Sequence, residues 1–263
     1  MSEPEWLAVA RRAALVSVPL YGIHHLRGHA FSPFIDLHAR NPDGFDAILP
    51  QQLPHLGLIV SGGNTLLLSI DTDRSLRIIA QTVDDAAGEA LDKGAKLLGM
   101  PYPGGPLIER AALAGNPKKF RFPRAMANAD DMRFSFSGLK TALRYQLEKM
   151  SNTTLKAEFS DICASYQQAV IAQLVKKTDQ VLAQSSYKSI GLSGGVANNQ
   201  RLRTAFEHLA KRKGLPLYVP RPKHTGDNAG MIAFAAWADP AGKIIDRNYN
   251  LTFQPALELS AQL

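Results

Sequence analysis

Residues 55–70 have the sequence HLGLIVSGGNTLLLSI. Two mostly apolar runs, 55–60 and 65–70, flank the turn-forming tetrapeptide SGGN at 61–64. A third run of strand-forming residues, LRIIA, follows within 76–81. We expect these three runs to be consecutive strands of one meander.

The chain beyond this meander alternates between helical and strand patterns. Apolar periodicity predicts helices at 86–98, 105–114 and 138–149 and a long helix within 156–184, and then strand 187–192, helix 199–213, strand 216–219 and helix 226–238. Such alternation favours an α/β domain with parallel strands. The order of elements is that of one lobe of the actin-like ATPase fold, a lobe of the ribonuclease-H-like kind.

The chain before the meander is too short for a second lobe of the same kind. It offers a helix at 4–15, a strand at 17–23, a helix from 25 to at least Pro33, and a loop at 39–54 rich in Pro, Asn, Asp and Gly. We therefore expect one complete lobe, residues 46–263, and a remnant of a first lobe, residues 1–45. The tail beyond 238 is expected to be irregular.

The composition of the 263 residues excludes several classes of protein. Apolar residues make up 45% and charged residues 20%, which excludes a disordered or collagen-like chain. The longest uncharged stretch, 47–70, is interrupted by Pro and Gly, so no membrane helix is expected. The single cysteine, Cys163, excludes an internal disulfide and a cysteine zinc cluster, and a reducing, cytoplasmic setting is expected.

The formal net charge is +7, and many of the cations fall into two clusters. One contains Lys118, Lys119, Arg121 and Arg124; the other contains Lys211, Arg212, Lys213, Arg221 and Lys223. Each cluster is either a solvated surface or a contact for an RNA backbone.

A histidine pair occurs in HHLRGH, residues 24–29. On a helix, His25 and His29 share one face, where both imidazoles can bind one metal ion. Leu26 stands where a zinc protease of the HExxH type needs its glutamate, which excludes that mechanism. The alternative is a pair of surface histidines.

A third metal ligand would have to come from 220–231, where Asp227 stands just before a predicted helix. Asp227 is either that ligand or, like Thr225, a candidate N-cap of the helix.

Two other features suggest a nucleotide. Asp92 lies too far inside its helix to serve the helix dipole, so a ribose hydroxyl contact is expected for it. Ser-Gly-Gly recurs after the predicted strand 187–192. Paired glycines either let backbone N–H groups approach a phosphate or form a tight turn without a ligand.

Six motifs in this order resemble the tRNA threonylcarbamoyladenosine transferases, once called glycoproteases. They are HHLRGH (24–29), LIVSGGNT (58–65), DDAAGEALDKGAKLLGMPYPGGP (84–106), FSFSGLKTA (134–142), SGGVANNQRLR (193–203) and PRPKHTGDNAGMIA (220–233). The resemblance runs from about residue 7 to 238. Family members begin with more of a first lobe, so Met1 is expected to mark a truncation or a misplaced start.

The resemblance implies particular site residues. The family's metal ligands correspond to His25, His29 and Asp227, with iron(II) as the expected metal and zinc as the alternative. Its adenylate-binding positions correspond to Ile59, Val60, Ser61, Gly62, Gly63, Asp92, Gly105, Glu109 and Asn199. No covalent nucleophile occurs in the motifs, so direct transfer is expected.

The resemblance also implies an activity. The enzyme would transfer a threonylcarbamoyl group from threonylcarbamoyl-adenylate to the exocyclic amine of the adenosine adjacent to the anticodon in tRNA. The expected protein partners are a smaller paralogous protein and an ATPase subunit. The alternatives are another carbamoyltransferase or kinase of the actin-like fold, and an inactive remnant that binds partners without turnover.

Overall fold

The computed structural model describes residues 3–123 and 131–249. Its main sheet has the strand order β4-β3-β2-β5-β6. β2, β3 and β4 pair antiparallel, whereas β5 pairs parallel with both β2 and β6, so the predicted meander and the parallel strands are confirmed. The five strands are β2 (His55–Val60), β3 (Thr65–Ile70), β4 (Leu76–Gln81), β5 (Ser189–Ser193) and β6 (Leu217–Tyr218).

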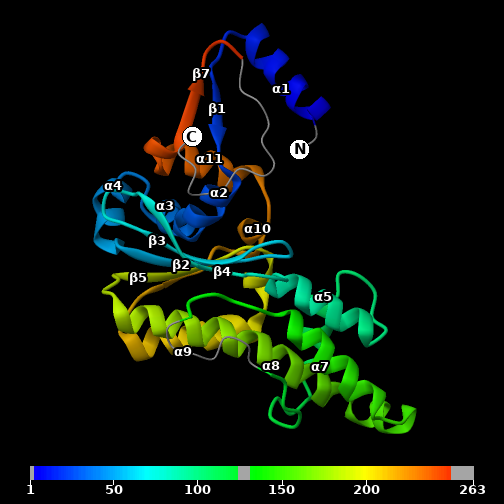
Figure 1. Ribbon diagram of the computed structural model, residues 1–263. Coiled ribbons are helices and arrows are strands. Elements are labelled where there is room, and N and C mark those ends of the chain that lie inside the picture. The colour runs from blue at the N-terminus through cyan, green and yellow to red at the C-terminus, as the bar shows by residue number, and fades with distance from the viewer. Residues whose placement is uncertain (1–2, 124–130, 250–263) are drawn as a thin grey trace.

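Helices cover both faces of this sheet (Figure 1). One face carries α5 (Ala87–Leu97), α6 (Gly105–Ala112), α7 (Ser137–Glu148), α8 (Asn152–Gln184) and α9 (Gln200–Lys213). The other face carries α2 (His25–Phe31), α3 (Ile35–Arg40), α4 (Phe45–Ile48) and α11 (Ala229–Ala238), with the short turns η1 (Ser32–Phe34) and η2 (Leu49–Gln52). Within the described ranges, no helix combines the length and the apolar character that crossing a membrane requires.

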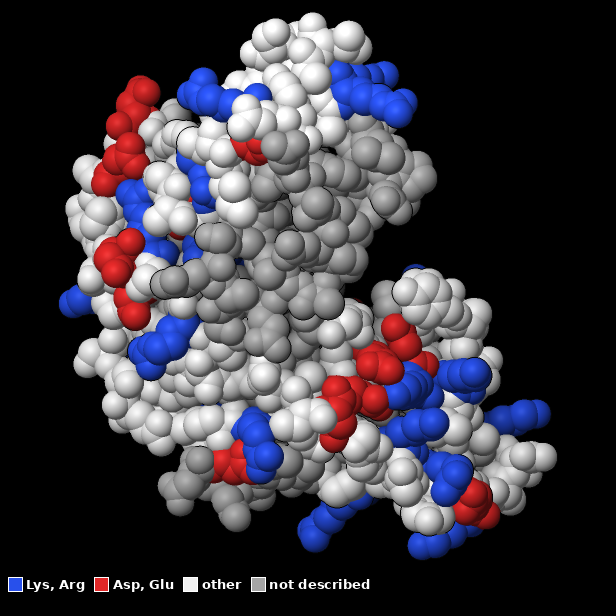
Figure 2. Space-filling view, turned by 45° about the horizontal axis from the view of Figure 1, so that its top comes forward, with Lys and Arg blue, Asp and Glu red and all other residues white. Residues whose placement is uncertain are grey.

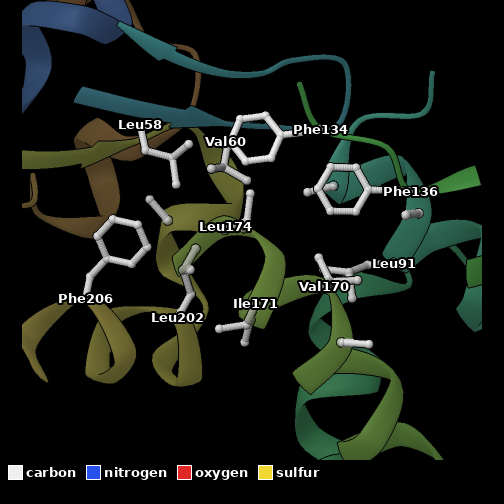
Figure 3. Close-up of a cluster of buried hydrophobic side chains, with 14 of the residues drawn as sticks. Leu58, Val60, Leu91, Phe134, Phe136, Val170, Ile171, Leu174, Leu202 and Phe206 are labelled. Carbon is white, nitrogen blue, oxygen red and sulfur yellow. The ribbon is translucent and has the colours of Figure 1, made fainter. Parts of the chain in front are cut away.

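Two hydrophobic cores form because neighbouring side chains of a strand point to opposite faces. On β2, Leu58 and Val60 enter the core beneath α5, α8 and α9, which Figure 3 shows, while Ile59 enters the core beneath α2 and α11. β2 and β3 are buried along their whole length, as expected for strands covered on both sides. Packing on both sides therefore fixes the positions of the ends of β2 and β3.

A smaller two-stranded sheet joins distant parts of the chain. β1 (Leu20–Ile23) follows α1 (Glu3–Leu15) and pairs antiparallel with β7 (Lys243–Asp246), which follows the turn η4 (Pro240–Gly242). The expectation of an irregular tail beyond 238 was therefore wrong for these residues. Pairing with β1 supplies the backbone hydrogen bonds of β7. No local sequence pattern predicts a partner strand so far away in the chain.

The predicted loop 39–54 was also wrong in large part, because α4 and η2 lie within it. Phe45 and Leu49 are fully buried in the core beneath α2 and α11. Their burial stabilises helical turns despite the Pro, Asn and Gly that surround them, since local propensity yields to tertiary packing.

His55 is a fully buried histidine at the start of β2. Ser189 donates its Oγ hydrogen to the carbonyl of Gln52, at 2.7 Å, so His55 Nδ1–H must donate to Ser189 Oγ, at 2.6 Å. His55 Nε2 has no hydrogen-bond partner within the described part of the chain. Burial lowers the pKa of this imidazole to about 3.

This depressed pKa predicts a loss of stability in mild acid. The unfolded chain binds a proton at His55 near pH 6.5, but the folded protein does not do so until about pH 3. Stability is therefore fully present above pH 6.5 and falls below it, by about 2 kcal/mol at pH 5. His55→Asn should flatten the dependence of the unfolding free energy on pH, measured by urea denaturation between pH 7 and 5. His208→Asn, at an exposed position, is the matched control; a slope unchanged in His55→Asn would contradict this account.

Candidate metal and nucleotide site

The two Ser-Gly-Gly segments lie at the same edge of the main sheet. β2 and β5 are parallel neighbours, with Ile59 paired to Ser193, so both chains leave the sheet at their carboxyl ends side by side. The first segment, 61–63, follows β2, and the second, 193–195, begins with the last residue of β5. Ligands of open α/β sheets bind outside the carboxyl ends of parallel strands. The two Ser-Gly-Gly segments, which are distant in sequence, therefore lie next to each other in the fold.

The first loop is fixed against the start of α5. Ala87 donates its N–H to Thr65 Oγ1 at 2.8 Å, and Gly88 donates to the carbonyl of Ser61 at 3.2 Å. A Cβ on Gly88 would lie only 2.5 Å from that carbonyl oxygen, so only glycine permits this approach. The positive end of the α5 dipole is therefore held beside the loop, where it favours an anion.

The second loop is fixed against the end of β2. Gly194 has φ +86° and ψ 162°, a conformation restricted to glycine. A Cβ on Gly194 would also collide with the carbonyl of Val60. This glycine is therefore required by the fold, independently of any ligand.

Three other glycines of the two loops have open surroundings. A Cβ on Gly62, Gly63 or Gly195 would meet no atom within 4 Å, and none of the three has positive φ. The fold does not require glycine at these positions. The open space beside their backbone is what a closely approaching ligand such as a phosphate needs.

The remaining predicted nucleotide positions surround this edge, and most of their side chains already have partners. Asp92 Oδ1 accepts N–H bonds from Gly104 and Gly105, at 2.8 and 3.0 Å, and Glu109 Oε1 accepts from Gln200 N–H at 2.6 Å. Asn199 caps α9 by accepting from Leu202 N–H at 3.0 Å. These contacts join α5 to the turn before α6, and α6 to the start of α9. Ile59 and Val60 are buried in opposite cores, so their side chains face away from any ligand.

The candidate metal ligands come from opposite ends of the chain. His25 and His29 lie one turn apart on α2, and Asp227 precedes α11. Asp227 Oδ1 lies 3.0 Å from His29 Nε2 and 3.3 Å from His25 Nε2, and one ligand atom of each residue falls within 4.8 Å of the others. Atoms about 2.0–2.2 Å from a common ion are typically about 3.0–3.5 Å apart, and both distances from Asp227 to the histidines lie in this range.

The local electrostatics also fit a metal centre. His29 is almost fully buried, and burial together with neighbouring His25 lowers its pKa, which favours the neutral imidazole that binds metals. Asp227 contributes a largely exposed carboxylate, and a mixed set of imidazole and carboxylate donors suits iron(II) or zinc.

Asp227 is not the N-cap of α11, and neither is Thr225. Asn228 fills that position, with its Oδ1 accepting from Met231 N–H at 2.9 Å. The expectation that Thr225 or Asp227 caps this helix was therefore wrong. A cap one residue after Asp227 leaves the aspartate carboxylate directed at the histidines.

Close packing of α2 against α11 sets the distance between the ligands. Arg27 forms an ion pair with the buried carboxylate of Asp239, just after α11. A Cβ on Gly28 would lie 2.9 Å from Ile232 Cδ1 and 3.2 Å from Met231 Cγ, so the missing side chain leaves room for these two residues of α11. Burial raises the pKa of Asp239, an effect that the Arg27 guanidinium opposes. Sequence patterns missed this pair because 212 positions separate its members.

Several cations of the two basic clusters are already paired with carboxylates. These pairs are Lys119 with Glu158 and Asp161, Arg212 and Lys213 with Asp179, and Arg221 with Asp36. Arg124 lies outside the described residues. Figure 2 shows a similar mixture of both charges on one face of the molecule. An RNA contact at these clusters would have to compete with the existing ion pairs.

Residues 7–234 match the model of the tRNA N6-adenosine threonylcarbamoyltransferase family. The chain belongs to this family. It is 43% identical over 230 residues to the tRNA N6-adenosine threonylcarbamoyltransferase of Trichlorobacter lovleyi, covering 87% of this chain and 64% of that relative. It is 44% identical over 218 residues to the same protein of Anaeromyxobacter dehalogenans, covering 82% of this chain and 62% of that relative. The chain thus spans less than two thirds of the length of these curated relatives.

Among solved structures, HypF of T. kodakarensis resembles the chain with a TM-score of 0.54. The likeness covers 78% of this chain and 38% of HypF, at 15% sequence identity, and therefore concerns the fold alone. Together with the family match, it confirms an α/β fold of the actin-like class.

The different status of the loop glycines predicts different effects on stability. Gly194→Ala should destabilise the protein by about 2 kcal/mol or more, from the disfavoured φ and the collision with Val60. Gly195→Ala, at the next position, should change stability by less than about 0.5 kcal/mol because its surroundings are open. Urea denaturation of the two variants checks this; equal losses would show that the loop differs from this description.

Proposed function

We propose that this chain carries the centre of an acyltransferase acting on tRNA. Its reaction moves the threonylcarbamoyl group from threonylcarbamoyl-adenylate to the exocyclic amine of the adenosine adjacent to the anticodon. The observation that carries the proposal is the convergence of His25, His29 and Asp227 from distant parts of a chain of this family.

The metal in this proposal is iron(II), with zinc as the alternative. His25, His29 and Asp227 would hold it, and a divalent ion there would supply a Lewis acid for the carbamoyl carbonyl or for a phosphate oxygen. Two imidazoles and one carboxylate leave further positions around an ion for such an oxygen.

The adenylate would occupy the edge where β2 and β5 end. The backbone N–H groups of Gly62, Gly63 and Gly195 would face its phosphate, in the open space beside these glycines. Asp92, Gly105, Glu109 and Asn199 would border the nucleoside.

The transfer would be direct. The exocyclic amine of adenosine attacks the carbamoyl carbonyl carbon, the bond from that carbon to the phosphate oxygen breaks, and AMP leaves with that electron pair. The amine loses one proton to the surrounding solvent. The chain then has to bind and orient the two substrates, a contribution that can supply much of the rate enhancement of a two-substrate reaction.

The proposed domain organisation has a complete actin-like lobe at 46–263 and a remnant of a first lobe at 1–45. The sheet from β2 to β6, covered on both faces, supports the complete lobe. α11 and β7, although they belong to 46–263 in sequence, pack against α2 and pair with β1. We further propose a cytoplasmic location, where tRNA is found, with a smaller paralogous protein and an ATPase subunit as partners.

The activity can be tested by incubating the chain with tRNA, threonylcarbamoyl-adenylate and iron(II). Nucleoside mass spectrometry should then detect threonylcarbamoyladenosine. Asp227→Asn should reduce its formation at least 100-fold, because the amide is a poor ligand for the ion. Asp73→Asn, an exposed carboxylate in the turn between β3 and β4, is the matched control. Absence of the product with wild-type chain, or full activity of Asp227→Asn, would refute the proposal.

The nucleotide part can be tested separately through AMP binding. Gly63→Ala should leave the unfolding free energy within about 0.5 kcal/mol of wild type, because a Cβ fits the free protein. It should weaken AMP binding about tenfold, since the methyl group occupies space meant for the phosphate. Gly138→Ala, another exposed glycine with open surroundings, is the control and should bind AMP normally. Undiminished AMP affinity in Gly63→Ala would remove this loop from the site.

A further inference from the structure

Asp227 lies on a very short connection between α10 (Pro222–Thr225) and α11. Its side chain is 74% exposed, whereas His29, across the site, is 2% exposed and fixed on a packed helix. A ligand set needs positions correct to about 0.2 Å. The neighbours of Asp227 in the chain must therefore hold its carboxylate in place.

One anchor follows Asp227 directly and is local. Asn228 caps α11 through Met231 N–H and also donates from Nδ2 to the carbonyl of Gly226 at 2.8 Å. These bonds fix the connection relative to α11. They do not join it to the sheet edge that bears the glycine loops.

The other anchor precedes Asp227 and reaches that edge. Thr225 is fully buried, donates from Oγ1 to the carbonyl of Pro222 at 2.9 Å, and accepts from Asn198 Nδ2 at 2.6 Å. Asn198 ends the short turn η3 (Gly195–Asn198), which begins with the last glycine of the loop after β5. One side-chain bond therefore connects the second glycine loop to the segment that carries Asp227.

Arg203 on α9 secures both sides of this connection. Its Nε donates to the carbonyl of Ala197 at 2.6 Å, and its Nη2 donates to Asn198 Oδ1 at 3.2 Å and to the carbonyl of Pro220 at 3.3 Å. One planar guanidinium thus orients the Asn198 amide toward Thr225 and binds the chain that enters α10.

We propose that Arg203, Asn198 and Thr225 form a positioning relay for the carboxylate of Asp227. The relay ties the metal ligand that lies outside α2 to the glycine loop after β5. None of the three residues touches the ion or the reacting atoms. The inference rests on the proposed function only in taking Asp227 as a metal ligand.

The relay can be tested by titrating the metal-free chain with Co²⁺ and following its visible absorption. Thr225→Val removes the hydroxyl at nearly constant shape, and Asn198→Ala removes its donor. Each should weaken Co²⁺ binding about tenfold, as for other residues that orient metal ligands. The double variant should be no weaker than the single variants, because both remove the same connection.

The control for a merely structural effect is Thr178→Val. Thr178 is also fully buried and donates from Oγ1 to the carbonyl of Leu174 within α8, remote from the site in sequence. This variant should lose stability like Thr225→Val but bind Co²⁺ with wild-type affinity. Co²⁺ affinities within twofold of wild type in folded Thr225→Val and Asn198→Ala would overturn the relay.

A second measurement needs no metal. Amide hydrogen exchange across residues 222–228 should be at least fivefold faster in Asn198→Ala than in wild type and in Thr178→Val. Equal exchange would overturn the relay, whether or not the wild-type chain binds Co²⁺. Faster exchange in Asn198→Ala, combined with a wild-type chain that binds no Co²⁺, would support the anchoring and would refute the metal assignment in the proposed function.

Discussion

The parallel pairing of β2 with β5 is the constraint on which the rest of the structure depends. These strands occupy the middle of the main sheet, and the described residues between them in sequence form β3, β4 and the helices α5, α6, α7 and α8. Their shared register brings two Ser-Gly-Gly segments, more than a hundred residues apart, to one edge. Burial of both strands on both faces holds that edge rigid, so the loops can depart from regular geometry.

Around this fixed edge, the candidate site is assembled by a few contacts between elements. Thr65 and Ser61 hold the start of α5, and Glu109 holds the start of α9. On the other side, the Arg27–Asp239 ion pair and the small Gly28 bring α2 against α11. A buried pair of this kind is costly to break from one side, because it leaves an uncompensated charge. The ion pair therefore helps to hold the histidine helix against α11.

The sequence predicted local features well and distant contacts poorly. Strands β2, β3 and β4 match the predicted ranges because apolar runs end at clear turn residues. The shared face of His25 and His29 followed from helical spacing. Asp84 shows the limit. It stands just before α5, where acidic residues commonly complement the helix dipole, but its carboxylate accepts hydrogen bonds from Ser135, Phe136 and Ser137, at the start of α7. No local pattern contains a partner about fifty residues away.

The wide separation of the candidate metal ligands has a consequence for biosynthesis. His29 leaves the ribosome 198 residues before Asp227, and the central sheet is encoded between them. Since domains tend to fold as they emerge, the sheet and its helices can form while the histidines still lack their carboxylate partner. If these residues bind an ion as proposed, the complete ligand set forms only after Asp227 has emerged, so ion binding would be among the last steps of maturation.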